Sequence, residues 1–144
     1  MSRVSIELPG EFRFSTTITI RITDINYGGH GGNDTVLSLI HEARMQFLLS
    51  AGYTEMNCGG AGLIMADAEI EFKKELFYAD AVTIWVAAIN FSKISFDLVY
   101  KMEKQAAGKN VLVAKVKTSM VCFNYETKKI AACPLQVIEK LSAS

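Results

Sequence analysis

The feature that most constrains the fold is residues 23–52, where a glycine-rich loop leads into the only long helical pattern of the chain. Apolar residues recur there at spacings of three or four, which predicts an amphipathic helix over about residues 34–51: Val36, Ile40, Ala43, Phe47 and Ala51. At ~1.5 Å per residue this helix would be roughly 27 Å long, enough to cross a small domain. Asn33 or Asp34 can serve as its N-cap, and Gly52 suits the position after its last turn. Its apolar arc is wide, so we expect a sheet to cover it.

Strand patterns surround the helix. An alternating segment before the loop predicts one strand, whose buried face would carry Phe12, Phe14, Ile18, Ile20 and Ile22. Beyond a loop at 53–62, four more strands joined by short turns are predicted at 63–73, 81–91, 94–102 and 111–123, and a short terminal helix at 134–141. Short turns imply antiparallel neighbours, so the class is α+β: one long helix wrapped by an antiparallel sheet of about five strands. The other sheet face and one edge would stay open and invite a second copy.

Composition narrows the function classes. With 144 residues we expect one domain, residues 1–144. Lys plus Arg and Asp plus Glu both number 15, so no basic field is available for nucleic acid or an anionic membrane. The cysteines, Cys58, Cys122 and Cys133, show no disulfide or metal-site spacing, and we interpret them as reduced. No apolar run approaches the roughly 20 residues that span a bilayer, and we expect a cytoplasmic protein without a metal.

The loop and helix also carry a motif. A known family has a strand ending in R-Y-x-D-x-D-x-x-G-H-x-N-N and then a helix with E-x-A-R or E-A-R; the corresponding residues here are Arg21, Ile22, Asp24, Asn26, Gly29, His30, Gly32, Asn33 and Glu42-Ala43-Arg44. The chain thus resembles the hotdog-fold acyl-CoA thioesterases of the 4-hydroxybenzoyl-CoA thioesterase family. The resemblance implies a hotdog fold, a homodimer or a dimer of dimers, and active sites at the dimer interface. It also implies hydrolysis of an acyl-CoA or acyl-carrier-protein thioester, with CoA as part of the substrate and no other cofactor.

Two residues depart from the family pattern. Asn26 stands where the family has its usual catalytic carboxylate, and Gly32 replaces the first Asn of the pair. Either another residue accepts the proton, or the chain is a non-catalytic protein that binds or assembles around acyl thioesters. A hotdog hydratase or dehydratase would require a paired histidine and acid in its own motif, which the sequence does not show.

The loop nevertheless contains groups suited to thioester chemistry. Backbone N–H groups at a helix start can polarise a carbonyl, and Gly28 and Gly29 allow the backbone to approach the substrate closely. The alternative is that these glycines only shape the loop. Asn26 can orient water or the carbonyl but cannot take a proton. Asp34, at the helix start, is the first candidate to replace the missing carboxylate, or it is simply the N-cap.

Three further residues have a functional and a structural interpretation. Glu42 can act as base or nucleophile, as a helix carboxylate does in relatives with another site layout, or it forms a salt bridge on the helix surface. His30 is either a general base or hydrogen-bond donor, or it fixes the loop. His41 has no motif partner, and we interpret it as a polar-face residue. For binding the substrate we predict the following residues, the last two being equally compatible with ordinary core: Tyr27, Gly28, Gly29, Asn33, Leu63 and Ile64.

Overall fold

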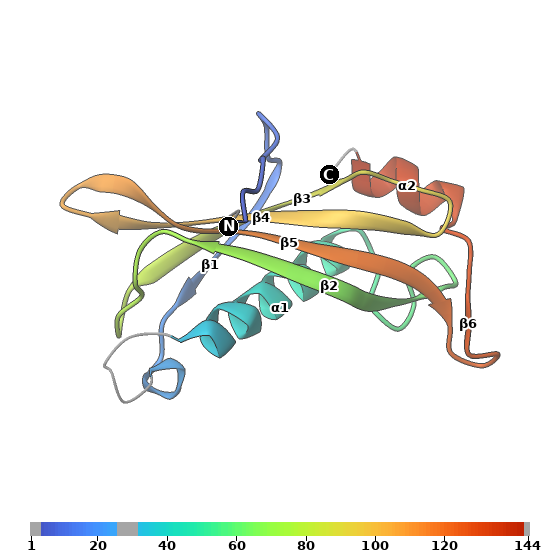
Figure 1. Cartoon of the computed structure of the whole chain (residues 1–144), viewed down its shortest axis with the longest axis horizontal. Coiled ribbons are helices and arrows are strands. Elements are labelled where there is room, and N and C mark those ends of the chain that lie inside the picture. Colours follow the sequence, from blue (N-terminus) through green and yellow to red (C-terminus); the bar gives the residue numbers. More distant parts are fainter. Residues whose placement is uncertain (1–3, 26–31, 143–144) are drawn as a thin grey trace.

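One long helix lies along one face of an antiparallel sheet (Figure 1). The computed structural model describes residues 4–25 and 32–142. The elements follow in the order β1 (Phe14–Thr19), a 3₁₀ turn (Ile22–Asp24), α1 (Asn33–Ser50), β2 (Gly62–Phe72), β3 (Ala81–Ile89), β4 (Ser95–Ala106), β5 (Lys109–Asn124), β6 (Lys129–Ile130) and α2 (Leu135–Ser142). The sheet order is β1-β3-β4-β5-β2, and β6 pairs with β5. The predicted α+β class and the five main strands are confirmed; the short β6 was not predicted.

The predicted apolar stripe of α1 is confirmed, because all five of its residues are buried against the sheet. Phe47 meets Phe14 of β1 edge to face, with 5.5 Å between ring centroids. Gly52 follows the helix with φ 84°, a conformation that glycine adopts without strain. The predicted N-cap is wrong, because Gly32 occupies that position and the first intrahelical hydrogen bond runs from Val36 N to Gly32 O over 3.2 Å.

The first strand is shorter than predicted. It ends at Thr19, and Ile22, expected on the buried face, is 69% exposed in the 3₁₀ turn. The carboxylate of Asp24 accepts hydrogen bonds from the backbone N–H of Arg21 at 2.8 Å and from its guanidinium Nε at 3.3 Å. These bonds hold residues 21–24 in a tight turn. The alternation of side chains along the strand therefore ends before the loop begins.

The alternation of β2 is real, but the apolar side of the strand is not buried as expected. Met65 is 46% exposed and Phe72 is 49% exposed. β2 is the last strand of the sheet and pairs only with β5, whereas α1 contacts β1 and β3. The edge expected to stay open is therefore β2, and apolar side chains lie along it.

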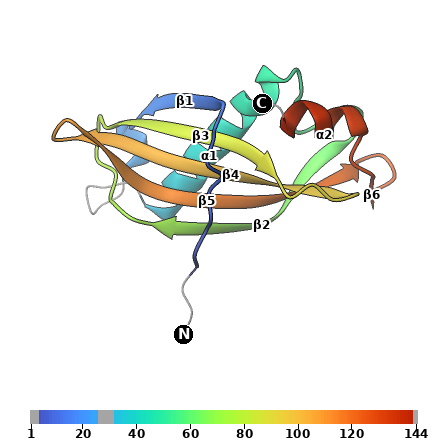
Figure 2. The ribbon, with the colours of Figure 1, turned by 90° about the horizontal axis from the view of Figure 1, so that it is seen from above.

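The opposite face of the sheet is not fully open, which corrects a second expectation. Residues 4–9 cross it (Figure 2). Ile6 is buried there; its N–H donates to Glu71 Oε1 at 3.0 Å, and its carbonyl accepts from Lys115 Nζ at 3.3 Å. Because Glu71 is on β2 and Lys115 on β5, this segment joins two neighbouring strands from outside.

The three cysteines are free thiols, as expected, and all are buried. Burial, with a contribution from nearby Cys133, raises the pKa of the Cys58 thiol to about 12. Burial also raises the pKa of Cys122 and of Cys133, whose thiols share a hydrogen bond. Since the thiolate is the reactive form, these cysteines act as core residues rather than as nucleophiles.

None of the described helices is long and apolar enough to cross a lipid bilayer. Within residues 4–25 and 32–142, no three His, Cys, Asp or Glu side chains gather into a set of metal ligands.

Candidate active site

The start of α1 presents backbone donors. Since the first intrahelical bond is made by Val36 N, the N–H groups of Asn33, Asp34 and Thr35 point out of the helix end without an intrahelical acceptor. The helix dipole adds positive potential at the same place. The side chains of Asn33 and Asp34 are exposed there. A carbonyl oxygen that becomes negative during reaction would be stabilised at this position.

A hydrogen bond holds this helix start to the end of the preceding turn. The hydroxyl of buried Thr35 donates to the backbone oxygen of Asp24 over 2.6 Å. The bond spans the segment 26–31 and fixes its two ends relative to each other. Burial alone would raise the pKa of Asp24, but the hydrogen bonds from Arg21 and its positive charge outweigh it and hold that pKa below its ordinary value. Asp24, the first Asp of the family pattern, thus has a structural role.

Five of the predicted site residues lie outside the described part of the chain: Asn26, Tyr27, Gly28, Gly29 and His30. Their roles stay predictions.

Two hollows flank α1. The first, which we call the β1–α1 hollow, measures about 450 Å³ and is lined by Thr17, Ile18, Thr19, Arg21, Ser38, Leu39, Glu42 and Gln46. Glu42 Oε2 accepts a hydrogen bond from Gln46 Nε2 at 2.7 Å, and Gln46 Oε1 accepts one from Thr16 of β1 at 2.6 Å. Glu42 therefore pairs with an amide of the next helical turn, and no cation within residues 4–25 and 32–142 forms a salt bridge with it.

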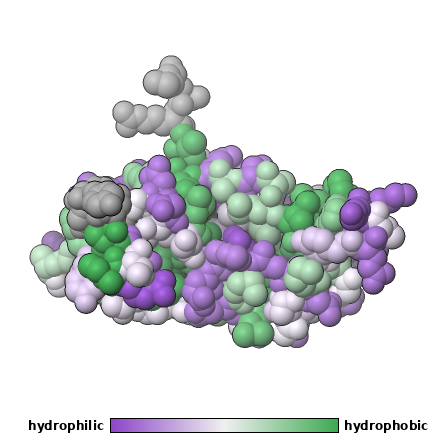
Figure 3. Space-filling model, turned by 90° about the horizontal axis from the view of Figure 1, so that it is seen from below, coloured by the Kyte–Doolittle hydropathy of each residue, from purple (hydrophilic) through white to green (hydrophobic). Residues whose placement is uncertain are grey.

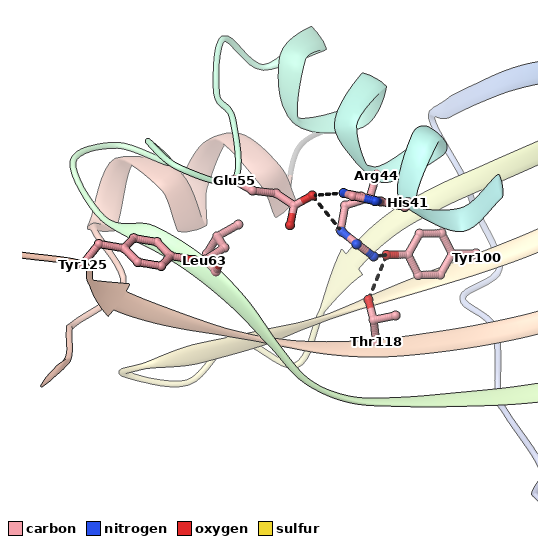
Figure 4. A network of polar contacts seen from close by, with 7 residues as sticks. All are labelled: His41, Arg44, Glu55, Leu63, Tyr100, Thr118 and Tyr125. Atoms are coloured by element: carbon pink, nitrogen blue, oxygen red, sulfur yellow. Dashed lines mark hydrogen bonds and ion pairs between the residues drawn. The ribbon is translucent and has the colours of Figure 1, made fainter. Parts of the chain in front are cut away.

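The second, the α1–β2 hollow, measures about 270 Å³ and is lined by Leu37, Ser38, Ile40, His41, Arg44 and Met65. Its walls are mainly apolar and its polar groups come from α1. The predicted binding residue Leu63 does not line it, because this side chain is part of the core and its carbonyl accepts a hydrogen bond from Tyr125 OH at 3.0 Å (Figure 4). Ile64 is half-buried and does not line it either.

A polar network runs from this hollow into the core (Figure 4). His41 Nε2 lies 2.8 Å from Glu55 Oε1, and Arg44 Nε lies 3.5 Å from the same oxygen. Arg44 Nη1 lies 3.4 Å from Tyr100 OH, which shares a 2.8 Å hydrogen bond with Thr118 Oγ1. Arg44 is only 6% exposed, so Glu55 provides the opposite charge that a buried guanidinium requires.

His41 lies on the exposed side of α1, and its partner Glu55 is a residue that the motif does not include. Glu55 lies in the loop between α1 and β2, where its backbone oxygen accepts a hydrogen bond from Leu63 N at 2.7 Å. A residue 14 positions away in an irregular loop leaves no periodic signal. The buried arginine was the available clue, since a cation beside an apolar stripe requires an acidic partner.

The face that carries α1 shows apolar surface at the end where the helix begins and again toward the opposite end, with polar surface between them (Figure 3). The helix start, the α1–β2 hollow beside it and the apolar surface at that end suit a carbonyl compound with an apolar group. One long helix on an antiparallel sheet, with a hollow beside the start of that helix, is the arrangement of the hotdog fold.

Comparison with known proteins gives the family. Residues 20–141 match the thioesterase-like superfamily. The chain is 31% identical over 102 residues to a putative esterase of Aquifex aeolicus. This match covers 69% of this chain and 75% of that protein. It is 27% identical over 116 residues to a 1,4-dihydroxy-2-naphthoyl-CoA hydrolase of Rippkaea orientalis. This match covers 78% of this chain and 83% of that protein. The chain belongs to the thioesterase-like superfamily.

The fold comparison agrees. The structure is similar, with a TM-score of 0.78 and 21% identity, to a 1,4-dihydroxy-2-naphthoyl-CoA thioesterase from Synechocystis, over 91% of this chain and 96% of that one. At this identity the likeness concerns the fold, and it supports the hotdog architecture.

Proposed function

We propose that this protein hydrolyses a thioester of coenzyme A, or of an acyl carrier protein, to a free acid and a thiol. The observation that carries the proposal is the start of α1, where three backbone N–H groups face outward beside an apolar hollow. The relative from Rippkaea orientalis is named as the hydrolase of a CoA thioester, which supports CoA as the carrier.

The helix start would polarise the thioester carbonyl. As water adds to the carbonyl carbon, negative charge forms on the oxygen, and the N–H groups of residues 33–35 would donate to it. Donors that are already oriented need no rearrangement at that moment. A single donor of this kind is typically worth about a hundredfold to a thousandfold in rate.

For the proton acceptor we propose Asp34. It is the second residue of α1, at the same end as the proposed carbonyl site. Glu42 lies nine residues beyond Asn33, or ~13 Å along the helix axis, and its carboxylate already accepts a hydrogen bond from Gln46, so Asp34 is the nearer candidate. Asp34 would take a proton from the attacking water; the carbon–sulfur bond then breaks, and the proton passes to the leaving thiolate. Asn26 would orient the water and His30 would donate to the carbonyl, as predicted.

The test is thiol release from a panel of short, long and aromatic acyl-CoAs, with Asp34→Asn beside the wild type. We expect turnover on one class of substrate and a fall in kcat of about a hundredfold to ten-thousandfold in Asp34→Asn, because the amide cannot accept a proton. Glu139→Gln, on the exposed side of α2, is the matched control and should keep wild-type kcat.

Unchanged turnover in Asp34→Asn would remove Asp34 from the reaction. If the wild type releases no thiol from any substrate while an acyl-CoA still raises its Tm, the protein binds thioesters without hydrolysing them. That outcome would favour the alternative function of a binding or assembly protein.

We further propose a homodimer joined along β2, in the cytoplasm. The open β2 edge with exposed Met65 and Phe72 supports the first statement, and the three free thiols suit a reducing compartment. Light scattering at micromolar concentration should give twice the chain mass of 15.9 kDa, or four times for a dimer of dimers. A mass equal to a single chain would contradict the dimer.

A further inference from the structure

We propose that Cys122 and Cys133 form a site of reversible oxidation, at which hydrogen peroxide converts the two buried thiols into a disulfide bond. Cys122 lies near the end of β5, and Cys133 lies in the segment between β6 and α2. β6 and α2 occupy the end of the sheet opposite the start of α1 (Figure 1). The inference therefore stands apart from the proposed hydrolysis, and its test requires no thioester.

The two sulfur atoms already face each other. Cys122 Sγ lies 2.8 Å from Cys133 Sγ, so an approach of less than about 1 Å brings them to the ~2.05 Å of a disulfide bond. Backbone hydrogen bonds hold both sides: the N–H of Ala131 donates to Cys122 O at 2.9 Å, and the N–H of Cys133 donates to Lys93 O at 2.8 Å. Paired backbone on either side therefore sets the position of the two thiols.

Exposure and hydrogen bonding distinguish the two thiols. Cys133 is 7% exposed and Cys122 is 1% exposed, so a small, uncharged oxidant reaches Cys133 first. Burial raises the pKa of both thiols, but the hydrogen bond with Cys122 lowers the pKa of Cys133 in part, because the Cys122 S–H can donate to a Cys133 thiolate. Cys133 is therefore the attacking group, and Cys122 is the thiol that completes the bond.

The oxidation proceeds in two steps. The Cys133 thiolate attacks one oxygen of hydrogen peroxide, the O–O bond breaks, and the departing hydroxide takes up the thiol proton as water; the sulfur is oxidised to a sulfenic acid. The sulfur of Cys122 then attacks that sulfur, the S–O bond breaks, and a second water leaves with the Cys122 proton. A dithiol reductant reverses the bond by exchange. Because burial keeps both thiols protonated at neutral pH, the pair remains an ordinary part of the core until the oxidant is in excess.

The bond would tie the start of α2 to β5. Cys133 lies two residues before Leu135, where α2 begins, and Val137 and Leu141 of that helix belong to the core. Closing a loop of about a dozen residues restricts the unfolded chain more than the folded one. We therefore expect oxidation to raise the Tm by about 3 to 10 °C.

The test maps the bond in the intact protein. The protein is treated with hydrogen peroxide, alkylated in denaturant without reductant and digested with trypsin, which leaves Cys58, Cys122 and Cys133 on three different peptides: residues 45–73, 118–128 and 130–140. We expect the second and third peptides to be linked, and the number of free thiols to fall from three to one. Dithiothreitol should restore all three thiols and the original Tm.

Matched variants identify the two partners. Cys122→Ser and Cys133→Ser should show neither the linked peptides nor the rise in Tm. Cys58→Ser removes the third buried thiol and is the control, which should still form the bond. Thermal melts before oxidation establish that each variant is folded, and Cys122→Ala and Cys133→Ala provide the same comparison if a serine variant does not fold.

Three results would overturn the inference. A linked peptide that contains residues 45–73 would assign the bond to Cys58. Unlinked peptides that carry sulfinic acid would mean that the thiols oxidise without pairing. A band of two chains on a non-reducing gel, absent after reduction, would place the bond between two molecules.

Discussion

Replacing Arg44 with methionine is expected to lower the free energy of unfolding by about 3 kcal/mol, as is typical when one partner of a buried ion pair is removed. The guanidinium is buried and contacts Glu55 and Tyr100, so its loss leaves a carboxylate and a core hydroxyl with fewer partners. Urea unfolding followed by circular dichroism measures the change.

Two controls accompany this variant. Arg13→Met alters an exposed arginine and should change the free energy of unfolding by no more than about 0.5 kcal/mol. The double variant Arg44→Met with Glu55→Gln should recover part of the loss, because the charge left without its partner is then removed too. If Arg44→Met is as stable as the wild type, the network in Figure 4 does not support the fold.

Replacing Thr35 with valine is expected to reduce kcat by about a hundredfold, the order of effect that a misplacement of about 1 Å produces. The substitution preserves the shape of the side chain but removes the hydroxyl that donates to Asp24 O, so the helix start is no longer held to the turn before the loop. The free energy of unfolding should fall by about 1 to 2 kcal/mol. Steady-state kinetics on the preferred thioester and urea unfolding measure the two effects.

Thr83→Val is the matched control for Thr35→Val. It also removes a hydroxyl, one that shares a 3.1 Å hydrogen bond with Thr17 on the sheet, but it lies on β3 away from the helix start. We expect wild-type kcat in this variant. A similar loss of kcat in both variants would mean that the contact between Thr35 and Asp24 has no special role in positioning the site.

Much of the fold was predictable because it depends on local periodicity. The stripe of α1 and the alternation of β4 and β5 each reflect one element facing one core, and the residues concerned are buried as expected. Prediction failed where side-chain hydrogen bonds overrode the period, as at Asp24. It also failed at the N-cap, where Gly32 rather than Asn33 or Asp34 occupies the position, and at β2, whose apolar side lies at a sheet edge.

Less of the site was predictable. The motif and the helical period located the helix start, since both are properties of one continuous segment, and the role of Asp34 there stays a prediction. The network around Arg44 joins α1, a loop, β4 and β5 through Glu55, Tyr100 and Thr118. These three residues lie 11 to 74 positions from Arg44 in the sequence and meet it only through the tertiary fold. A single sequence therefore contains no local pattern that reveals the network.

The walls of the α1–β2 hollow contain residues of two kinds, some that hold the fold together and some at the surface. Its walls combine the partly exposed Leu37 and Met65 with Ile40 of the buried stripe and the buried Arg44. Substitutions at exposed positions usually change stability by less than about 0.5 kcal/mol. Descendants of this chain can therefore change the shape of the hollow by substitutions at residues 37 and 38, whereas a change at residue 40 or 44 would also cost stability.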